Sequence, residues 1–378
     1  MRVAAVLAMS VGMSASSVPV AGAAVAPCRV TNLTTQQLHD GSGPNLQTAI
    51  DQAEGGTRLR VRGICVGTFE IGKDLTLLGR STAAYPIPTI DGDDADTVIT
   101  VSTGRVVIRD LTITNGNAEF GTGLGGGIYN AGILALTGSA SVRGNDTGTG
   151  RGGGIYNNGT LDLYGASVVS GNGAGRGGGI FNALGHTVRL HGSASVWGNH
   201  VFFLAGGIYN EGTLGLYDRS SVSENNATDD FSEGGGIANF GTTTMSDSSS
   251  VSGNEAGDAG GSPTAGGGGI YNEGTLTLRN LSSVRGNTTI SGSGGGGITN
   301  VGGVVTLNGA SSIRRNIATD ANGGGIVNHG TLIMNGSSSI RRNIALGGSG
   351  GGISGSGVLV GAVEGVNVSD NQPDDIFP

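Results

Sequence analysis

Short apolar segments, separated by glycine, serine and asparagine, recur along most of the chain. The string Gly-Gly-Ile-x-Asn occurs eight times, at intervals of 25 to 33 residues. Its asparagines are Asn130, Asn157, Asn182, Asn210, Asn239, Asn272, Asn300 and Asn328. A second series follows an aliphatic residue by three positions and consists of Asn145, Asn172, Asn199, Asn225, Asn254, Asn287, Asn316, Asn343 and Asn371. Such regular spacing is typical of a repeat protein.

Each repeat contains three short extended segments, and none has the 10 to 12 residues of helical periodicity that a helical array needs. Leucine-rich, ankyrin and tetratricopeptide arrays are thereby excluded. We therefore predict an all-β fold, a right-handed parallel β-helix with three strands per turn. It should comprise roughly ten turns over residues 57–378. Residues 350–353 form a ninth, degenerate copy of the string, in which Gly355 replaces the asparagine.

The alternation within each repeat predicts which side chains point into the coil. Ile270, Leu276, Leu278 and Val284 should face inward and contact their equivalents one turn above and below. The two asparagine series should form ladders, because a buried amide without a partner costs about 1 to 3 kcal/mol. Stacked in register, each amide can donate a hydrogen bond to the carbonyl of the next.

The segment before the repeats has a different pattern. Residues 45–54 carry apolar side chains at Leu46, Ala49, Ile50 and Ala53, which predicts a short amphipathic helix that covers the open end of the coil. We assign residues 24–56 to this N-terminal cap. Residues 1–23 combine an early arginine, a short apolar run and small residues, as in a secretory signal peptide.

The composition limits the classes of function. Of 378 residues 77 are glycine, but charged residues make up only 13% and the mean hydropathy is +0.03, so the chain should fold rather than stay disordered. A net charge of −8 argues against nucleic acid as a partner. No stretch beyond the signal peptide has 18 apolar residues, so no membrane span is expected. The sequence pattern gives no indication of the oligomeric state.

Two cysteines, Cys28 and Cys65, remain after the expected cleavage. In an exported protein such a pair favours a disulfide. In the chain-entropy model, closing this loop would stabilise the folded protein by about 4 kcal/mol. A catalytic or metal-binding pair is the alternative, but no cluster of histidine or cysteine lies near it in sequence.

The strings GTFEIGKDLTLLG, TIDG and LTITNG after the predicted helix resemble the opening of secreted proteins of the pectin-lyase-like β-helix superfamily. The pairing of GGGIYN with VxxN resembles the repeats of chlamydial polymorphic outer membrane proteins, in which GGAI-type and FxxN strings recur. The resemblance implies a β-helix that is secreted or exposed at the cell surface. Valine or isoleucine replaces the phenylalanine of FxxN throughout, and no terminal β-barrel segment is evident.

No catalytic residue can be assigned from the sequence. A polysaccharide lyase would need carboxylates on adjacent turns that hold Ca²⁺, and the column after the first asparagine series has no two acids on consecutive turns. A polygalacturonase-like hydrolase would need paired aspartates near a Gly-His-Gly segment, and only Gly185-His186 is present. Four acids, Asp91, Asp93, Asp94 and Asp96, favour a solvated turn that binds Ca²⁺ weakly at most. No other metal or cofactor is expected.

Two outward-facing series are the candidate ligand-binding residues. Tyr129, Tyr156, Phe181 and Tyr209 should lie on consecutive turns, with Tyr271 beyond a gap at Ala238. Such rings can stack on sugars, or on one another under glycine-rich loops. The second series consists of Arg285, Arg314 and Arg341, joined by Arg315 and Arg342. These arginines can splay into water or grip a polyanion together.

These features favour an exported, non-catalytic protein that binds cell-surface glycans or acidic polysaccharides, in the manner of an adhesin. The alternative is a carbohydrate-active enzyme, a lyase or a hydrolase, whose site lies in the irregular loops. Residues 254–269 form the longest of these loops.

Overall fold

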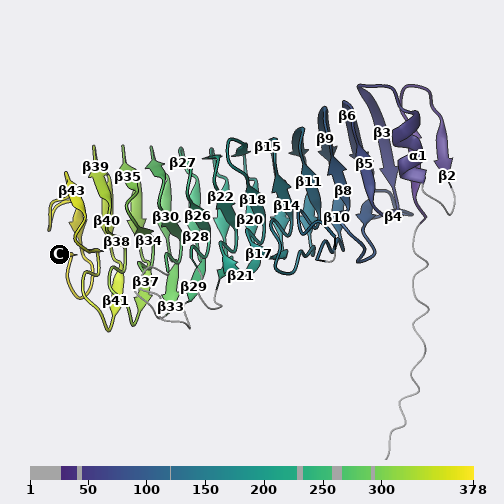
Figure 1. Ribbon diagram of the computed structural model, residues 1–378. Coiled ribbons are helices and arrows are strands. Elements are labelled where there is room, and N and C mark those ends of the chain that lie inside the picture. The colour runs from purple at the N-terminus through teal and green to yellow at the C-terminus, as the bar shows by residue number, and fades with distance from the viewer. Residues whose placement is uncertain (1–26, 41–44, 120, 228–232, 258–265, 291–293) are drawn as a thin grey trace, which may run out of the picture.

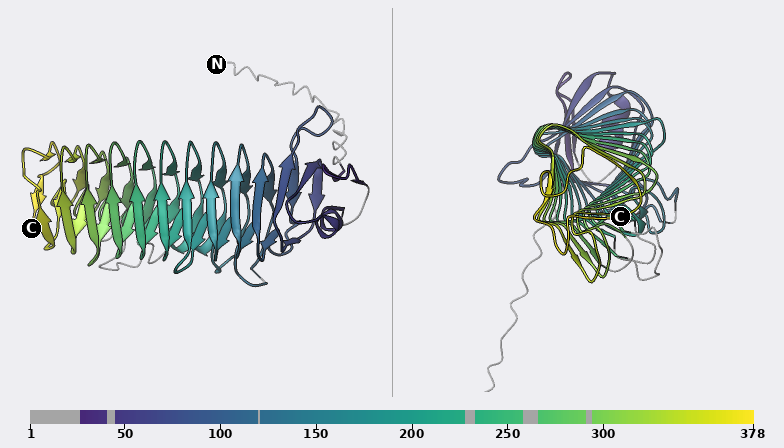
Figure 2. Two further views of the ribbon diagram at one scale, coloured as in Figure 1. Left: turned by 90° about the horizontal axis from the view of Figure 1, so that it is seen from above. Right: turned by 90° about the vertical axis from the view of Figure 1, so that its left-hand side faces the viewer.

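The protein is described by a computed structural model that covers residues 27–40, 45–119, 121–227, 233–257, 266–290 and 294–378. It is an all-β parallel solenoid of about ten turns with a short helix at its N-terminal end, as the sequence predicts (Figure 1). Seen along the axis, successive turns lie over one another (Figure 2). The predicted signal peptide, residues 1–23, lies outside the described residues.

Sheet 1 has 14 strands and extends over the whole solenoid. Its strands are parallel except β1, which pairs antiparallel with β2 and β3. In spatial order they are β2 (Leu38–Asp40), β1 (Arg29–Asn32), β3 (Thr57–Arg62), β6 (Leu75–Gly79), β9 (Arg105–Arg109), β12 (Ile133–Thr137), β15 (Thr160–Leu163), β19 (Thr187–Leu190), β23 (Thr213–Leu216), β27 (Thr242–Met245), β31 (Thr275–Leu278), β35 (Val304–Leu307), β39 (Thr331–Met334) and β43 (Val358–Val360).

Sheets 2 and 3 have 12 parallel strands each. Sheet 2 consists of β4 (Ile64–Val66), β7 (Thr89–Asp91), β10 (Thr112–Thr114), β13 (Ser141–Arg143), β16 (Val168–Ser170), β20 (Ser195–Trp197), β24 (Ser221–Ser223), β28 (Ser250–Ser252), β32 (Ser283–Arg285), β36 (Ser312–Arg314), β40 (Ser339–Arg341) and β44 (Val368–Ser369). Sheet 3 consists of β5 (Phe69–Ile71), β8 (Ile99–Val101), β11 (Ile128–Asn130), β14 (Ile155–Asn157), β18 (Ile180–Asn182), β22 (Ile208–Asn210), β26 (Ile237–Asn239), β30 (Ile270–Asn272), β34 (Ile298–Asn300), β38 (Ile326–Asn328), β42 (Ile353–Ser354) and β45 (Ile376–Phe377).

A fourth sheet of seven strands adds to the three per turn that the sequence predicts. It forms because the residues after the second asparagine series also pair with the next turn, although they carry no marked alternation of apolar and polar side chains. One of these strands lies within residues 254–269, which the sequence suggests are an irregular loop. The strands are β17 (Gly173–Arg176), β21 (His200–Leu204), β25 (Asn226–Ala227), β29 (Glu255–Gly257), β33 (Thr288–Ile290), β37 (Ile317–Thr319) and β41 (Ile344–Leu346).

The core is a set of aliphatic columns along the solenoid axis. Ile270, Leu276, Leu278 and Val284 have no exposed surface, which confirms their predicted inward orientation. Each lies in register with an aliphatic residue of the following turn, as Leu278 does with Leu307. Burying such a side chain contributes about 1.5 to 3 kcal/mol, so the repeats stabilise one another through these columns.

The two asparagine series form the predicted ladders. In the first, Asn130 Nδ2 donates to Asn157 Oδ1 at 2.7 Å, and the same bond repeats at every step to Asn328. In the second, the side-chain amides donate in the same direction from Asn145 to Asn371. That ladder ends where Asn371 Nδ2 donates to Asp375 Oδ1 at 2.9 Å.

The glycine strings are required by the close approach of successive turns. Gly152 has a φ of +67°, a left-handed conformation in which a side chain is strained. At Gly154, a Cβ atom would lie 2.6 Å from the carbonyl oxygen of Gly179 and 2.8 Å from Asn172 Nδ2. Glycine at this position therefore leaves room both for the next turn and for the asparagine ladder.

The N-terminal end of the core is closed by α1 (Asn45–Gln52), which ends two residues earlier than predicted. Leu46, Ala49 and Ile50 of this helix are buried in the main core cluster. A disulfide joins Cys28 to Cys65, as expected. It ties the segment before α1 to β4 in the first turn.

Candidate functional site

Five arginines gather on the outer face of sheet 2 and the adjoining turn, and we call them the arginine stripe: Arg285, Arg314, Arg315, Arg341 and Arg342. The structure places Arg285 beside Arg314 and Arg314 beside Arg341 on three consecutive strands, β32, β36 and β40, as predicted. All are exposed except Arg314, which is half-buried. Equivalent residues of neighbouring strands lie about 4.8 Å apart, so these charges are close together.

No carboxylate forms an ion pair with the arginine stripe in the part of the chain that the structure describes. The ion pairs among those residues join Arg29 to Asp40, Arg109 to Asp110 and Arg189 to Asp162. Burial lowers the pKa of Arg314, and the neighbouring charges of Arg285, Arg315 and Arg341 lower it further. The stripe is therefore a cluster of positive charge without an ion-pair partner among the described residues, on a protein with a net charge of −8.

Two members of the stripe hold an unfavourable backbone conformation. Arg315 and Arg342 each have a φ of +56°. Such a conformation costs a residue with a side chain roughly 1 to 2 kcal/mol. In five other turns the equivalent residue has nearly the same φ and is a glycine: Gly144, Gly171, Gly198, Gly253 and Gly286. Asparagine, glutamate and aspartate hold this conformation at Asn115, Glu224 and Asp370. The local backbone conformation thus favours glycine at two positions where this sequence has an arginine, Arg315 and Arg342.

The rings of the other predicted series form a continuous stack on the outer face of sheet 3. Tyr129, Tyr156, Phe181 and Tyr209, which we call the aromatic column, have ring centroids 4.8 to 5.6 Å apart and planes within 10° of parallel. The gap at Ala238 is filled by Phe240, whose ring lies 5.0 Å from that of Tyr209 and 5.9 Å from that of Tyr271.

The aromatic column points away from the coil, but two of its four rings are buried, as is Tyr271 beyond Phe240. Phe181 has no exposed surface, Tyr209 is 6% exposed and Tyr271 is 2% exposed. The Arg151 guanidinium lies 5.2 Å from the centre of the Phe181 ring and covers it. Of the two possibilities, packing against neighbouring rings therefore applies to these three: Phe181 stacks on Tyr209, and Tyr271 lies against Phe240. Tyr129 and Tyr156 are half-buried.

Carboxylates flank the C-terminal part of this ring stack. Tyr271 Oη donates to Glu273 Oε1 at 2.6 Å, and burial together with this bond raises the pKa of Tyr271. Burial, and then Glu211, raise the pKa of Tyr209 to about 12. Burial, with the charge of Glu273 as a lesser cause, raises the pKa of Glu233 to about 7. Glu233 can therefore exchange a proton near neutral pH.

The raised pKa of Glu233 predicts a pH-dependent contribution to stability. In the unfolded chain this carboxyl ionises near pH 4.5, and in the folded protein near pH 7, so stability is lost as the pH rises between these values. Replacing Glu233 by Gln should leave the melting temperature at pH 5 almost unchanged. At pH 8 it should stabilise the protein by about 1 to 2 kcal/mol, after allowance for solvent screening of a partly exposed group.

Calorimetry at both pH values tests this expectation, with Glu364→Gln as the matched control because Glu364 is exposed. The control should show no difference between the two pH values. An equal effect of Glu233→Gln at pH 5 and pH 8 would contradict the assignment.

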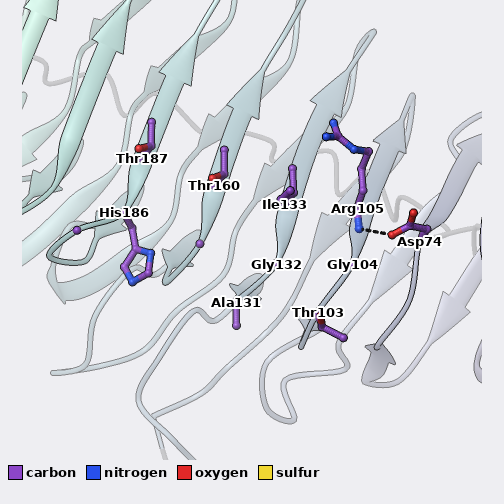
Figure 3. A pocket seen from close by; sticks show the side chains of 12 residues that line it. Asp74, Thr103, Gly104, Arg105, Ala131, Gly132, Ile133, Thr160, His186 and Thr187 are labelled. Carbon is purple, nitrogen blue, oxygen red and sulfur yellow. Dashed lines mark hydrogen bonds between the residues drawn. The ribbon is translucent and has the colours of Figure 1, made fainter.

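A groove of about 530 Å³ runs along the corner between sheets 3 and 1 (Figure 3). Asp74, Arg105 and His186 line it, together with threonines and glycines of successive turns. The Arg105 backbone N–H donates to Asp74 Oδ1 at 2.8 Å. The histidine that the sequence singles out beside Gly185 therefore lies in this groove, but no second carboxylate accompanies Asp74 among the residues that line it.

The acid-rich turn does not gather its carboxylates. Asp91 Oδ1 accepts hydrogen bonds from the Asp93 N–H and from Asn115 Nδ2, whereas Asp96 Oδ1 accepts from the Thr97 N–H. Among the described residues, no three histidine, cysteine or acidic side chains are arranged to hold a metal ion. Weak Ca²⁺ binding at this turn stays a prediction.

No family model, no curated protein and no solved structure matches this chain. The structure supports the fold that the resemblance implies, a parallel β-solenoid built from repeats. Among its described residues, no helix has the length and apolar character that crossing a membrane requires.

Proposed function

We propose that this chain is an exported β-solenoid that binds acidic polymers at cell surfaces or in polysaccharides through the arginine stripe, without catalysis. One observation carries the proposal: five guanidinium groups lie together without an ion-pair partner among the residues that the structure describes, two of them where the backbone favours glycine. Guanidinium groups recognise carboxylate, phosphate and sulfate through paired hydrogen bonds. The resemblance of the repeats to those of chlamydial surface proteins supports a secreted or cell-surface location and an adhesin-like role.

Replacing Arg314, Arg315, Arg341 and Arg342 together by Gln should weaken binding to polygalacturonate at least tenfold at low salt. The slope of log affinity against log salt should also become shallower, because fewer counterions are released on binding. Binding is measured by calorimetry at several salt concentrations. The melting temperature should change little, since exposed side chains contribute little to stability.

A control variant changes the net charge equally at exposed arginines outside the stripe, with Gln at Arg58, Arg80, Arg219 and Arg279. It should retain most of the affinity. Changing only Arg315 and Arg342 to Gly should raise the melting temperature and still weaken binding, because the strained conformation is relieved while two charges are lost. Wild-type protein that ignores polygalacturonate and other polyanions at low salt would refute the proposal.

A carbohydrate-active enzyme, a lyase or a hydrolase, remains the second candidate. Glu233, Glu273 and Tyr271 favour it, because a carboxyl with a pKa near 7 beside an acceptor carboxylate is suited to general acid catalysis. Formation of reducing ends, or of unsaturated uronates absorbing near ~232 nm, would support this function if Glu233→Gln abolished it.

A further inference from the structure

The aromatic column ends at its N-terminal side in a pocket. Going toward the N-terminus, the residues in register after Tyr129 are Thr100 and then Glu70. Threonine is much smaller than the rings that precede it, so one position of the stack lacks a ring. A cavity of about 560 Å³ lies here, and Tyr129, Thr100 and Glu70 all line it. Its volume is within the roughly 300–1,000 Å³ typical of small-molecule sites.

One face of the Tyr129 ring is already used; Tyr129 also lines this cavity, and its register neighbour on the opposite side is Thr100. The used face stacks on Tyr156, with centroids 5.6 Å apart and planes 5° from parallel. The opposite end of the stack differs, because Tyr271 is only 2% exposed although the residue beyond it is also a threonine, Thr299. Tyr129 thus lines a pocket at the N-terminal end of the stack, whereas Tyr271 is buried at the other end.

Apart from Phe69, the other side chains that line the cavity are polar, and those that carry a charge are acidic. Asp96 and Glu70 contribute carboxylates, and Thr97, Thr100 and Thr122 contribute hydroxyl groups. None of the described lining residues is cationic. Asp96 Oδ1 accepts a bond from the Thr97 N–H at 2.7 Å, and the Glu70 N–H and carbonyl are both bonded to the Gln47 amide. The Gln47 contacts hold the strand that carries Glu70, and each carboxylate retains further acceptor positions.

We propose that this cavity binds an uncharged pyranose ring, which stacks on the free face of Tyr129 in the place of the missing ring. The apolar face of a sugar suits an aromatic ring, and its hydroxyl groups can donate to the carboxylates of Glu70 and Asp96. A uronate is disfavoured, because its carboxylate would meet two like charges and no cation. This site is separate from the arginine stripe, which binds anions at the other end of the solenoid.

Calorimetry and saturation-transfer NMR with methyl β-glucoside, methyl β-galactoside and N-acetylglucosamine test the proposal, with glucuronate as the anionic counterpart. At least one neutral sugar should bind with a Kd on the order of 1 mM, as expected for a single ring. Glucuronate should bind at least tenfold more weakly than that sugar.

Thr100→Tyr is the decisive variant, because it supplies the missing ring and fills the site. It should reduce sugar binding more than tenfold while the melting temperature stays the same or rises, which separates the loss from misfolding. Tyr129→Ala should also lose binding. Tyr164→Ala, which alters an exposed ring stacked on His191, should bind as the wild type does.

Three results would overturn the proposal: no binding of any neutral sugar by the wild-type chain, undiminished binding by Thr100→Tyr, or glucuronate binding as tight as that of the neutral sugars. Because these probes include no polyanion, failure here is distinguishable from failure of the arginine stripe to bind polygalacturonate.

Discussion

Replacing Asn272 by Asp is expected to lower the free energy of unfolding at pH 7 by about 3 to 5 kcal/mol. Asn272 is fully buried, and its Nδ2 donates to Asn300 Oδ1 at 2.8 Å and to the Gly274 carbonyl at 3.1 Å. A carboxylate of the same shape cannot donate either bond and would place an oxygen against these acceptors. Its other oxygen could still accept from Asn239 Nδ2, which donates to Asn272 at 2.7 Å.

The destabilisation should depend on pH, because the introduced carboxyl is more easily protonated in the buried ladder than in the unfolded chain. Denaturant unfolding should thus show a smaller loss near pH 4 than at pH 7. Asn335→Asp is the matched control: Asn335 Nδ2 also donates to the asparagine of a neighbouring turn, Asn308, at 3.0 Å, but on the exposed surface. Its cost should stay below about 1 kcal/mol. Equal losses for the two variants would show that ladder burial contributes nothing.

The repeat pattern predicts those features of the fold that depend on register between turns. A residue such as Ile270 recurs at the same point of every repeat. Alignment of the repeats alone therefore predicts which side chains of each strand point inward and which residues of neighbouring turns they lie beside. The same reasoning predicts the asparagine ladders, because a buried amide needs a partner and the next turn supplies an identical one. The arginine stripe is predictable for this reason too, since it depends only on equivalent positions.

Exposure is not predictable in this way, because it depends on segments that do not repeat. The alternation of side chains along the strand shows that Phe181 points away from the coil. It does not show that Arg151 lies over the Phe181 ring. The column of Ala238 alone predicts a gap in the stack, and the structure shows that Phe240 fills it from the adjacent column. A search for a ring in either neighbouring column of the same turn would have indicated this.

Glu233 is not among the candidate residues that the sequence indicates, because it belongs to neither asparagine column. It lies four residues before Ile237, at a position where the chain approaches sheet 3, and it pairs with Leu204 and Gly266 in neighbouring turns. Alignment of the residues ahead of each glycine string places Arg151 and Arg176 in the same column. The sequence thus indicates that charged residues lie beside the rings. The pKa of Glu233 is raised by burial, which only the structure shows.

Replacing Leu276 by Asp should have the largest effect of any single substitution considered, a loss of about 4 kcal/mol or more in the free energy of unfolding. Leu276 is fully buried and lies between Thr243 and Val305 in the columns of sheet 1. An unpaired carboxylate there would lack any cation or water. Because each turn packs only on its neighbours, the loss should be local, and calorimetry should show the single transition divide into two.

Thr277→Asp provides the comparison on the same strand. Thr277 points outward and is half-buried, and its column already contains an aspartate, Asp162, four turns toward the N-terminus. The substitution should therefore change stability by no more than about 0.5 kcal/mol. Limited proteolysis should cut Leu276→Asp within the central turns and leave Thr277→Asp resistant. If both variants melted as the wild type does, the inward assignment of Leu276 would be wrong, and if both unfolded, the strand would tolerate charge on neither face.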